Sequence, residues 1–358
     1  MIYIFNFVLL SASSFFERIM KTKLFLIISS IVLVSFTGLR GTSFAGDSQQ
    51  YAWDYSIYAN NFGKGKFEVG FSFLEKLCAW LGFSVTTFFI IIAFLSILFL
   101  VLGFEKLAIF PASALLYYYS RFFINRDMNQ IRAALAASII LFSLQYLTNK
   151  KSNFLKFAFF ILLAIVIHKA AFIAFILYPV GYLMNKYIWK SNKRKRIFIY
   201  IITLVIAFIL SVSCSNIVGN IIGNFDTTYV SRTSDYGKDS YGLANPVIWL
   251  QILIGLLTLI TVKYEDNEKL KICFSSYFIS TILLVLFSNY YVLAGRLSTL
   301  LATVEPILIL QLIDYCIPAK KWNSNLVSWI LFLGISVAVF FIINCYNTQL
   351  PLYNVALY

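Results

Sequence analysis

The segment DMNQIRAALAAS, Asp127–Ser138, opens a run of apolar residues that continues to about residue 147. A run of this length can cross a bilayer as a helix. Arg132 lies inside the run, and a guanidinium at membrane depth is costly unless it faces protein or a water-filled cavity. The alanines that follow it allow close packing against neighbouring helices. The segment therefore predicts a helical membrane protein in which Arg132 points into a polar cavity, where an anionic ligand supplies its partner.

Apolar runs recur from one end of the 358-residue chain to the other. The composition is 60% hydrophobic, with 36 Phe and 23 Tyr, which is more apolar surface than a soluble domain of this size can cover. We expect an all-α, polytopic integral membrane protein that forms a single membrane domain over residues 1–358. The runs predict about 12 transmembrane segments (10–12), at residues 2–16, 23–39, 85–102, 106–123, 130–147, 154–167, 169–185, 197–214, 245–262, 271–288, 297–314 and 326–343.

The segment 154–187 is too long to be one membrane helix. Its roughly 34 residues would span about 51 Å, well beyond an apolar core of about 30 Å, so we expect a helix hairpin or a re-entrant turn near residue 168. With that turn, 18 of the 29 basic residues fall on one side of the membrane, which the positive-inside rule assigns to the cytoplasm. Both termini, His168 and two long polar segments, 40–84 and 215–245, then face outward.

The net charge of +14 does not indicate nucleic acid, because lysines and arginines on cytoplasmic loops account for it. The five cysteines are scattered, without a CxxC pair or a metal-binding spacing. His168 is the single histidine, which excludes a multi-histidine metal site. We therefore predict no metal and no cofactor.

Arginine is concentrated on the side predicted to face outward, where it makes up six of the remaining eleven basic residues. Orienting the chain in the membrane requires only positive charge, which lysine also supplies. A guanidinium can in addition bind phosphate or carboxylate through two parallel hydrogen bonds. Arg40, Arg132 and Arg296 lie at the ends of apolar runs or inside them. They predict an anion-binding surface, with snorkelling to lipid headgroups as the alternative. Two neighbouring faces of one helix would carry polar side chains, the first with Asn125, Asn129, Arg132 and Ala136 and the second with Arg126, Gln130, Ala133 and Ala137.

The first outward segment, 40–84, combines acidic and aromatic residues. Asp47 precedes Tyr51 by one helical turn, a position typical of an N-cap. Tyr51, Tyr55 and Tyr58 would share a helical face, where they either mark the membrane interface or stack on sugar rings. An amphipathic helix beginning at Glu68 should lie along the membrane surface, with an apolar stripe of Phe71, Leu74, Leu77, Cys78 and Leu81.

Two side chains on the outward side could exchange a proton with a substrate, His168 in IVIHKAAF and Asp47. Spacing does not choose between them. Glu305, in TVEPIL, lies inside an apolar run and precedes a kinking proline. It is a functional candidate as an intramembrane acid, or else Pro306 marks a helix break.

Four motifs together resemble the EpsG-like family of Wzy-type polysaccharide polymerases. They are GLRGTSFAGDSQQY (38–51), EVGFSFLEKL (68–77), MNQIRAALA (128–136) and IVIHKAAFI (165–173). Their order and spacing agree with the family over about residues 25–185. The chain departs from the family pattern at three places: Val69 replaces a proline, Ala133 a frequent glutamine, and Lys169-Ala170 a Lys/Thr-Ser pair.

The resemblance implies an enzyme of the bacterial cytoplasmic membrane that polymerises undecaprenyl-pyrophosphate-linked oligosaccharide repeat units at its outer face. The reaction is a glycosyl transfer with a lipid pyrophosphate as leaving group, and a chain-length regulator and a flippase are possible partners. We predict His168 or Asp47 as the general base. The residues predicted to bind substrate are Arg40, Tyr51, Glu68, Arg126, Gln130, Arg132 and Arg296.

Two other classes compete with the polymerase. A flippase or transporter of lipid-linked sugars would also need cations, but it predicts inverted repeats and polar residues through the membrane depth, and neither is evident. A membrane O-acyltransferase of surface sugars would use a histidine but needs a cytosolic acyl-donor site, and the cytoplasmic loops are short. The segment 215–245 faces the substrate or forms a polar lid.

Overall fold

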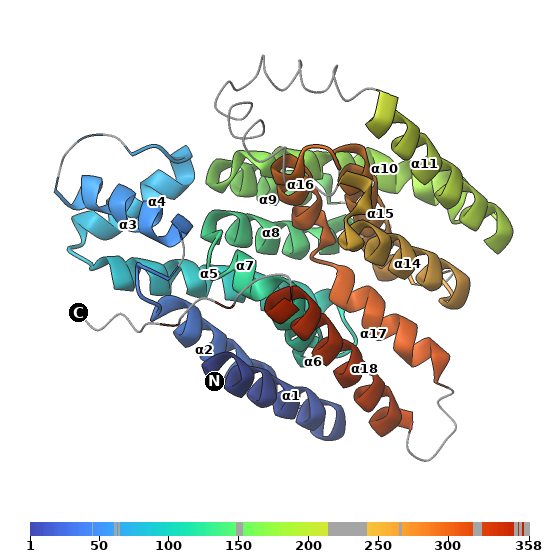
Figure 1. Cartoon of the computed structure of the whole chain (residues 1–358), viewed down its shortest axis with the longest axis horizontal. Coiled ribbons are helices and arrows are strands. Elements are labelled where there is room, and N and C mark those ends of the chain that lie inside the picture. The colour runs from blue at the N-terminus through green and yellow to red at the C-terminus, as the bar shows by residue number, and fades with distance from the viewer. Residues whose placement is uncertain are drawn as a thin grey trace. The chain divides into compact units, whose positions relative to one another are not determined.

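The computed structural model describes residues 1–44, 46–60, 63, 65–147, 153–213, 242–264, 267–317, 324–346, 350 and 353, and its elements in these residues are helices (Figure 1). Most of the segment 215–245 lies outside these residues. The contacts between residues divide the chain into two compact units, and we describe each by itself. Unit 1 comprises Met1–Phe172 and Ile309–Tyr358, and unit 2 comprises Ile173–Leu308.

Unit 1 holds the helices from the first one to the start of η3, and the last ones in chain order. They are α1 (Ile2–Met20), α2 (Leu24–Gly38), α3 (Gly46–Ala59), α4 (Val69–Trp80), α5 (Val85–Leu107), α6 (Pro111–Tyr118), η1 (Tyr119–Phe123), α7 (Ile124–Arg126), α8 (Ile131–Ser143), η2 (Leu144–Leu147), α9 (Phe154–Ile167), the start of η3 (Lys169–Ile176), most of α17 (Glu305–Cys316), α18 (Ser324–Phe340) and η7 (Phe341–Tyr346). The long apolar helix α5 packs against α2 and α8, and α8 packs against α9.

Unit 2 is built around α15, whose surface is buried on nearly every side. Its elements are α10 (Leu177–Leu183), η4 (Met184–Ile188), α11 (Lys193–Ser213), η6 (Gly242–Ala244), α14 (Pro246–Thr261), α15 (Glu268–Leu286) and α16 (Tyr291–Ala302). Helices α10, α11, α14 and α16 pack against α15.

The prediction of about 12 transmembrane segments is wrong. In the described residues, six helices are long and apolar enough to cross a membrane, or seven if the bent pair Val292–Ala302 and Glu305–Cys316 is one span. The six are Ile2–Met20, Val85–Leu107, Lys169–Ile188, Lys193–Ser213, Glu268–Leu286 and Asn325–Cys345. The chain is an all-helical, polytopic membrane protein with fewer spans than its apolar runs suggested, and the outward placement of both termini stays a prediction.

The difference arises because helix breaks divide or shorten the other apolar runs. Four apolar helices have 10–17 residues, namely Leu24–Gly38, Ile131–Leu147, Phe154–Ile167 and Pro246–Thr261. At a rise of about 1.5 Å per residue, a 15-residue helix reaches only about 22 Å, short of a core of about 30 Å. The run 106–123 is also interrupted, because α6 begins at Pro111 and continues into the wider turns of η1. Hydropathy does not register such breaks.

Helices are interrupted at two of the places where the sequence predicted it, whereas the hairpin or re-entrant turn expected near residue 168 stays a prediction. The helix α9 ends at Ile167, and His168 adopts an extended conformation before the chain resumes at Lys169. The axis bends by 54° between Ala302 and Glu305, next to Pro306. Glu305 is fully buried and accepts a hydrogen bond from the hydroxyl of Tyr277 at 3.0 Å.

A third break, between α7 and α8, was not predicted. The chain turns over residues 127–130, so Asn125 and Asn129 do not share a face of α8 with Arg132 as expected. The buried Asp127 anchors this turn by accepting hydrogen bonds from Ser96 at 2.8 Å and from Tyr118 at 2.6 Å.

The helices α3 and α4 pack against each other beside α5. On α4 the inward face carries Phe71, Ser72, Glu75 and Cys78, whereas Leu77 and Leu81 of the expected apolar stripe are exposed. The predicted apolar stripe was therefore only partly correct, because the face of α4 that packs against α3 also carries a serine and a carboxyl group. On α3, Tyr51 and Tyr55 are buried among phenylalanine rings of α4 and α5 rather than exposed for sugar stacking.

Candidate active site

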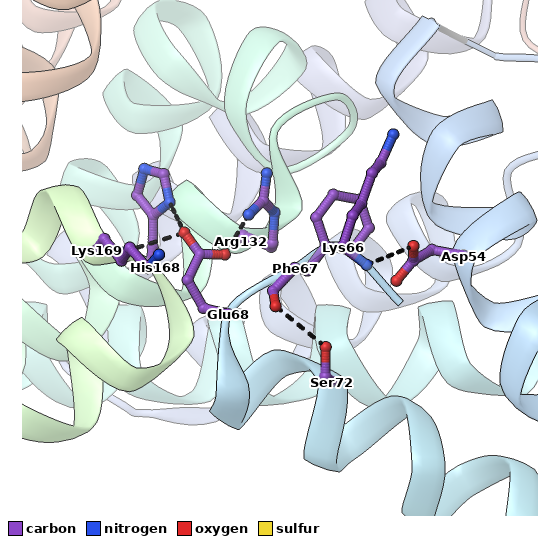
Figure 2. A network of polar contacts seen from close by, with 8 residues as sticks. All are labelled: Asp54, Lys66, Phe67, Glu68, Ser72, Arg132, His168 and Lys169. Carbon is purple, nitrogen blue, oxygen red and sulfur yellow. Dashed lines mark hydrogen bonds and ion pairs between the residues drawn. The ribbon is translucent and has the colours of Figure 1, made fainter. Parts of the chain in front are cut away.

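Three interrupted helices of unit 1 bring charged side chains together (Figure 2). Glu68 directly precedes α4 and has an extended backbone. His168 directly follows α9, and Arg132 is the second residue of α8. Because α9 packs against both α4 and α8, residues from three of the sequence motifs meet at one place.

The Glu68 carboxylate is the centre of this cluster. One of its oxygens, Oε2, accepts a hydrogen bond from Arg132 Nη1. The other, Oε1, lies 3.4 Å from His168 Nδ1 and accepts the backbone N–H of Lys169 at 3.2 Å. Burial by itself would raise the pKa of Glu68, but contact with His168 and the charge of Arg132 outweigh it and lower the pKa to about 2. Glu68 is therefore an anion at neutral pH.

His168 presents its two ring nitrogens to different surroundings. Both nitrogens are buried and lack a hydrogen-bond partner among the residues that the structure describes, but Nδ1 lies 3.4 Å from the Glu68 carboxylate, at ion-pair distance. The side chain is 10% exposed. A carboxylate beside one imidazole nitrogen orients the ring and favours the tautomer whose other nitrogen can accept a proton. His168 is thus arranged as a proton acceptor at Nε2.

Arg132 is held between a carboxylate and two aromatic rings. Its guanidinium carbon lies 4.1 Å from the centroid of the Phe67 ring and 5.6 Å from that of Tyr51. Its Nε is buried without a hydrogen-bond partner in the described part of the chain. Arg132 therefore already has Glu68 as an anionic partner inside the protein, and its Nε retains a donor for a ligand. The side chain is 21% exposed, more than that of Glu68 or His168.

The other predicted residues of unit 1 lie in different surroundings. Arg40 is fully buried, donates to the Thr37 carbonyl and lies 4.6 Å from the centroid of the Phe89 ring. Arg126 is also buried, 4.7 Å from the centroid of Phe122. Gln130 precedes α8 and is partly exposed. Asp47 lies in the first turn of α3, partly exposed, one turn before the buried Tyr51.

Arg296 belongs to α16 in unit 2, so it is not placed relative to the cluster in unit 1. Its substrate-binding role stays a prediction.

Sequence reasoning missed several contributors to the cluster. Phe67 could have been suspected because it precedes Glu68, and the Lys169 amide because a helix that breaks at His168 frees backbone donors. Two fully buried carboxyl groups beside the cluster, Asp54 on α3 and Glu75 on α4, were also missed. Glu75 occupies an inward position of an amphipathic helix, which was a readable signal.

Comparison with known proteins supports the resemblance found in the sequence. The EpsG family profile matches residues 23–355. The amylovoran biosynthesis protein AmsC of Erwinia amylovora is 22% identical over 308 residues, which are 80% of this chain and 79% of that protein. No solved structure matches the chain. Because the profile covers nearly the whole sequence, including all three residues of the cluster, the chain belongs to the EpsG family.

Proposed function

We propose that this protein polymerises polyprenyl-pyrophosphate-linked oligosaccharide repeat units into an exopolysaccharide. Membership of the EpsG family and the likeness to an amylovoran biosynthesis protein support a role in exopolysaccharide biosynthesis. The observation that carries the finer proposal is the orientation of His168, with Nδ1 against Glu68 and Nε2 unpartnered in the described residues. A glycosyl transfer to a hydroxyl group needs a base arranged in this way.

In the proposed reaction, an acceptor hydroxyl of one repeat unit attacks the anomeric carbon of the growing chain. His168 Nε2 takes the hydroxyl proton as the new glycosidic bond forms. The bond between the anomeric carbon and the pyrophosphate oxygen breaks, and its electron pair leaves with the lipid pyrophosphate. Glu68 stabilises the imidazolium that results, as a buried carboxylate does in other acid–base dyads. Asp47 is the alternative base.

The developing charge on the pyrophosphate requires cations or hydrogen-bond donors. Arg132 is suited to this role because its Nε is unpartnered in the described chain and its side chain is partly exposed. Arg40 has no exposed surface, so we assign it no direct contact with substrate in this conformation. We propose Arg296 as a further cation, with Tyr51, Arg126 and Gln130 as residues that shape the site.

Elongation by purified protein in liposomes tests this proposal. The substrate is a lipid-linked repeat unit, and the products are separated by length. Wild-type protein should lengthen the saccharide, His168→Ala should not, and Glu105→Gln, which changes a carboxylate paired with Lys23, should behave as wild type. Movement of the lipid-linked unit across the bilayer without elongation would instead support a flippase and overturn the proposal.

A further inference from the structure

Two carboxyl groups outside the Glu68 cluster are buried against each other. Asp54 lies on the inward face of α3 and Glu75 on the inward face of α4, and both are 0% exposed. Their side chains are within hydrogen-bonding contact. If both were ionised, three of their four oxygens, Asp54 Oδ2 and both oxygens of Glu75, would lack a donor in the described part of the chain. A single proton between them supplies the missing hydrogen bond and removes one buried charge.

The groups that face this pair do not neutralise it. Arg132 on α8 acts on Glu75 from a distance, but its own hydrogen bond goes to Glu68. Cys78 on α4 and Tyr55 on α3 are further titratable neighbours of Glu75, and the Tyr58 hydroxyl on α3 lies beside Asp54 at Gly65. Burial, followed by the adjacent Asp54 carboxyl, raises the pKa of Glu75 to about 9. The neutral form therefore persists over the physiological range.

The remaining oxygen of the pair holds the segment that leads to Glu68. Asp54 Oδ1 accepts the backbone N–H of Lys66 at 3.0 Å (Figure 2). The preceding residue, Gly65, donates its N–H to the Tyr58 hydroxyl at 2.8 Å. A Cβ at Gly65 would lie 2.3 Å from Asp54 Oδ2, so glycine is what allows the backbone to approach this closely. Glu68 follows this anchored stretch by two residues.

We propose that Asp54 and Glu75 are positioning residues that share one proton and, as a protonated pair, fix the segment 65–67 and thereby place Glu68 against His168 and Arg132. Neither residue touches substrate. Loss of the shared proton puts two charges in a buried site, and their repulsion releases the Lys66 amide. The geometry of the pair does not depend on the proposed reaction, although its effect on catalysis rests on that function.

The sign of the pH dependence follows from the raised pKa. A carboxyl group whose pKa is higher in the folded chain contributes stability that is complete below its ordinary value of 4.5 and is lost as pH rises toward about 9. The Glu68 position should therefore be well defined at neutral pH and should loosen above about pH 9.

Two measurements on the full-length protein in detergent test the pair without any assay of function. Infrared spectroscopy should show the C=O stretch of a protonated carboxylic acid at neutral pH in the wild type, disappearing above about pH 9. The difference spectrum between wild type and Glu75→Gln should contain this component of the band, and the difference between wild type and the control Glu268→Gln, at a carboxylate paired with Lys271, should not. Absence of the band in folded wild-type protein would overturn the proposal.

Hydrogen exchange tests the positioning step. In Asp54→Ala the Lys66 amide should exchange about tenfold faster, the effect of losing one hydrogen bond. Glu75→Gln, whose amide can still donate to Asp54, should keep the wild-type protection and retain it above pH 9, where the wild type loses it. If Asp54→Ala does not fold, the exchange rates of the Lys66 amide in wild type and Glu75→Gln, compared across pH, are sufficient to test the proposal. Identical exchange in those two proteins at every pH would overturn the proposal.

An elongation assay across pH separates this inference from the proposed function. The alkaline loss of activity in the wild type should be absent from Glu75→Gln. Wild-type protein that does not elongate at any pH would refute the proposed function, while the infrared and exchange results would still decide whether the pair exists.

Discussion

Unit 1 contains two groups of charged residues at helix breaks, and they differ in how far their charged side chains are exposed. In the first, Glu68 and Arg132 are partly exposed and His168 lies buried beside them, and Arg132 Nε and both ring nitrogens of His168 have no hydrogen-bond partner among the described residues. In the second, Arg40 and Asp127 are buried, and Asp127 accepts hydrogen bonds from two hydroxyl groups. Both groups come from motifs that the sequence singled out.

The difference separates a site from a scaffold. A charge that is buried and bonded within the protein sets the position of the chain, since removing it leaves an unpaired partner. A charge that keeps an open donor or acceptor near the surface can act on a ligand. On this basis we expect substitutions in the first group to alter mainly catalysis, with only a small effect on stability, and those in the second to alter mainly stability.

The largest effect is expected for His168→Ala. Removal of a general base typically lowers the rate by about 10²–10⁴-fold, and we expect kcat for elongation to fall by that amount while the thermal unfolding temperature stays close to that of the wild type. The measurement is the initial rate with a purified lipid-linked repeat unit. A rate that survives in His168→Ala but falls in Asp47→Asn would assign the base to Asp47 instead.

A smaller effect is expected for Arg132→Lys. Lysine keeps the positive charge but loses the planar fork that can hold Glu68 and a phosphate at the same time. Loss of one charge-assisted hydrogen bond, about 1.5–3 kcal/mol, predicts a decrease in kcat/KM of roughly 10–150-fold. Steady-state kinetics with varied lipid-linked substrate provide the test. An unchanged kcat/KM would remove Arg132 from the substrate site.

Arg40→Met should lower the stability of the protein rather than its activity. The substitution preserves volume but removes the hydrogen bond to the Thr37 carbonyl and the contact with the Phe89 ring. We expect a loss of about 1–3 kcal/mol in stability, seen as a lower unfolding temperature in detergent, with kcat per folded molecule near that of the wild type. A stable variant without activity would contradict the distinction between the two groups and return Arg40 to the substrate site.

The smallest effect concerns acid stability. The pKa of Glu68 is lowered to about 2, so its ion pairs contribute stability that is complete above the ordinary value of 4.5 and is lost as pH falls from there toward about 2. Unfolding temperatures of the wild type and Glu68→Gln should therefore differ at neutral pH and converge in acid. A difference that stays constant down to pH about 2 would show that Glu68 is not held as an anion.

The sequence predicted those features that depend on the local pattern of residues. The helical class, the break at His168 and the bend near Pro306 follow from composition and from residues that interrupt helices. The separate motifs around Glu68, Arg132 and His168 were each recognisable. The number of spans could not be predicted, because an apolar run has the same hydropathy whether or not a turn divides it.

Contacts between distant motifs were beyond local reasoning. Glu68 and Lys169 are 101 positions apart and meet only because α4 packs against α9. The anionic partner of Arg132 was expected from a ligand, yet the chain itself provides one. Likewise, the pairing of Asp54 with Glu75 depends on which faces of α3 and α4 turn toward each other, and a single sequence does not specify that.

A double-mutant cycle on Glu68 and His168 tests most directly whether the cluster acts as one catalytic unit. The rates of elongation would be measured for the wild type, Glu68→Gln, His168→Ala and the double variant under the same conditions. Because Glu68 is proposed to act through His168, the double variant should be no slower than His168→Ala alone. Losses that multiply in the double variant would show that the two residues act independently and would contradict the proposed dyad.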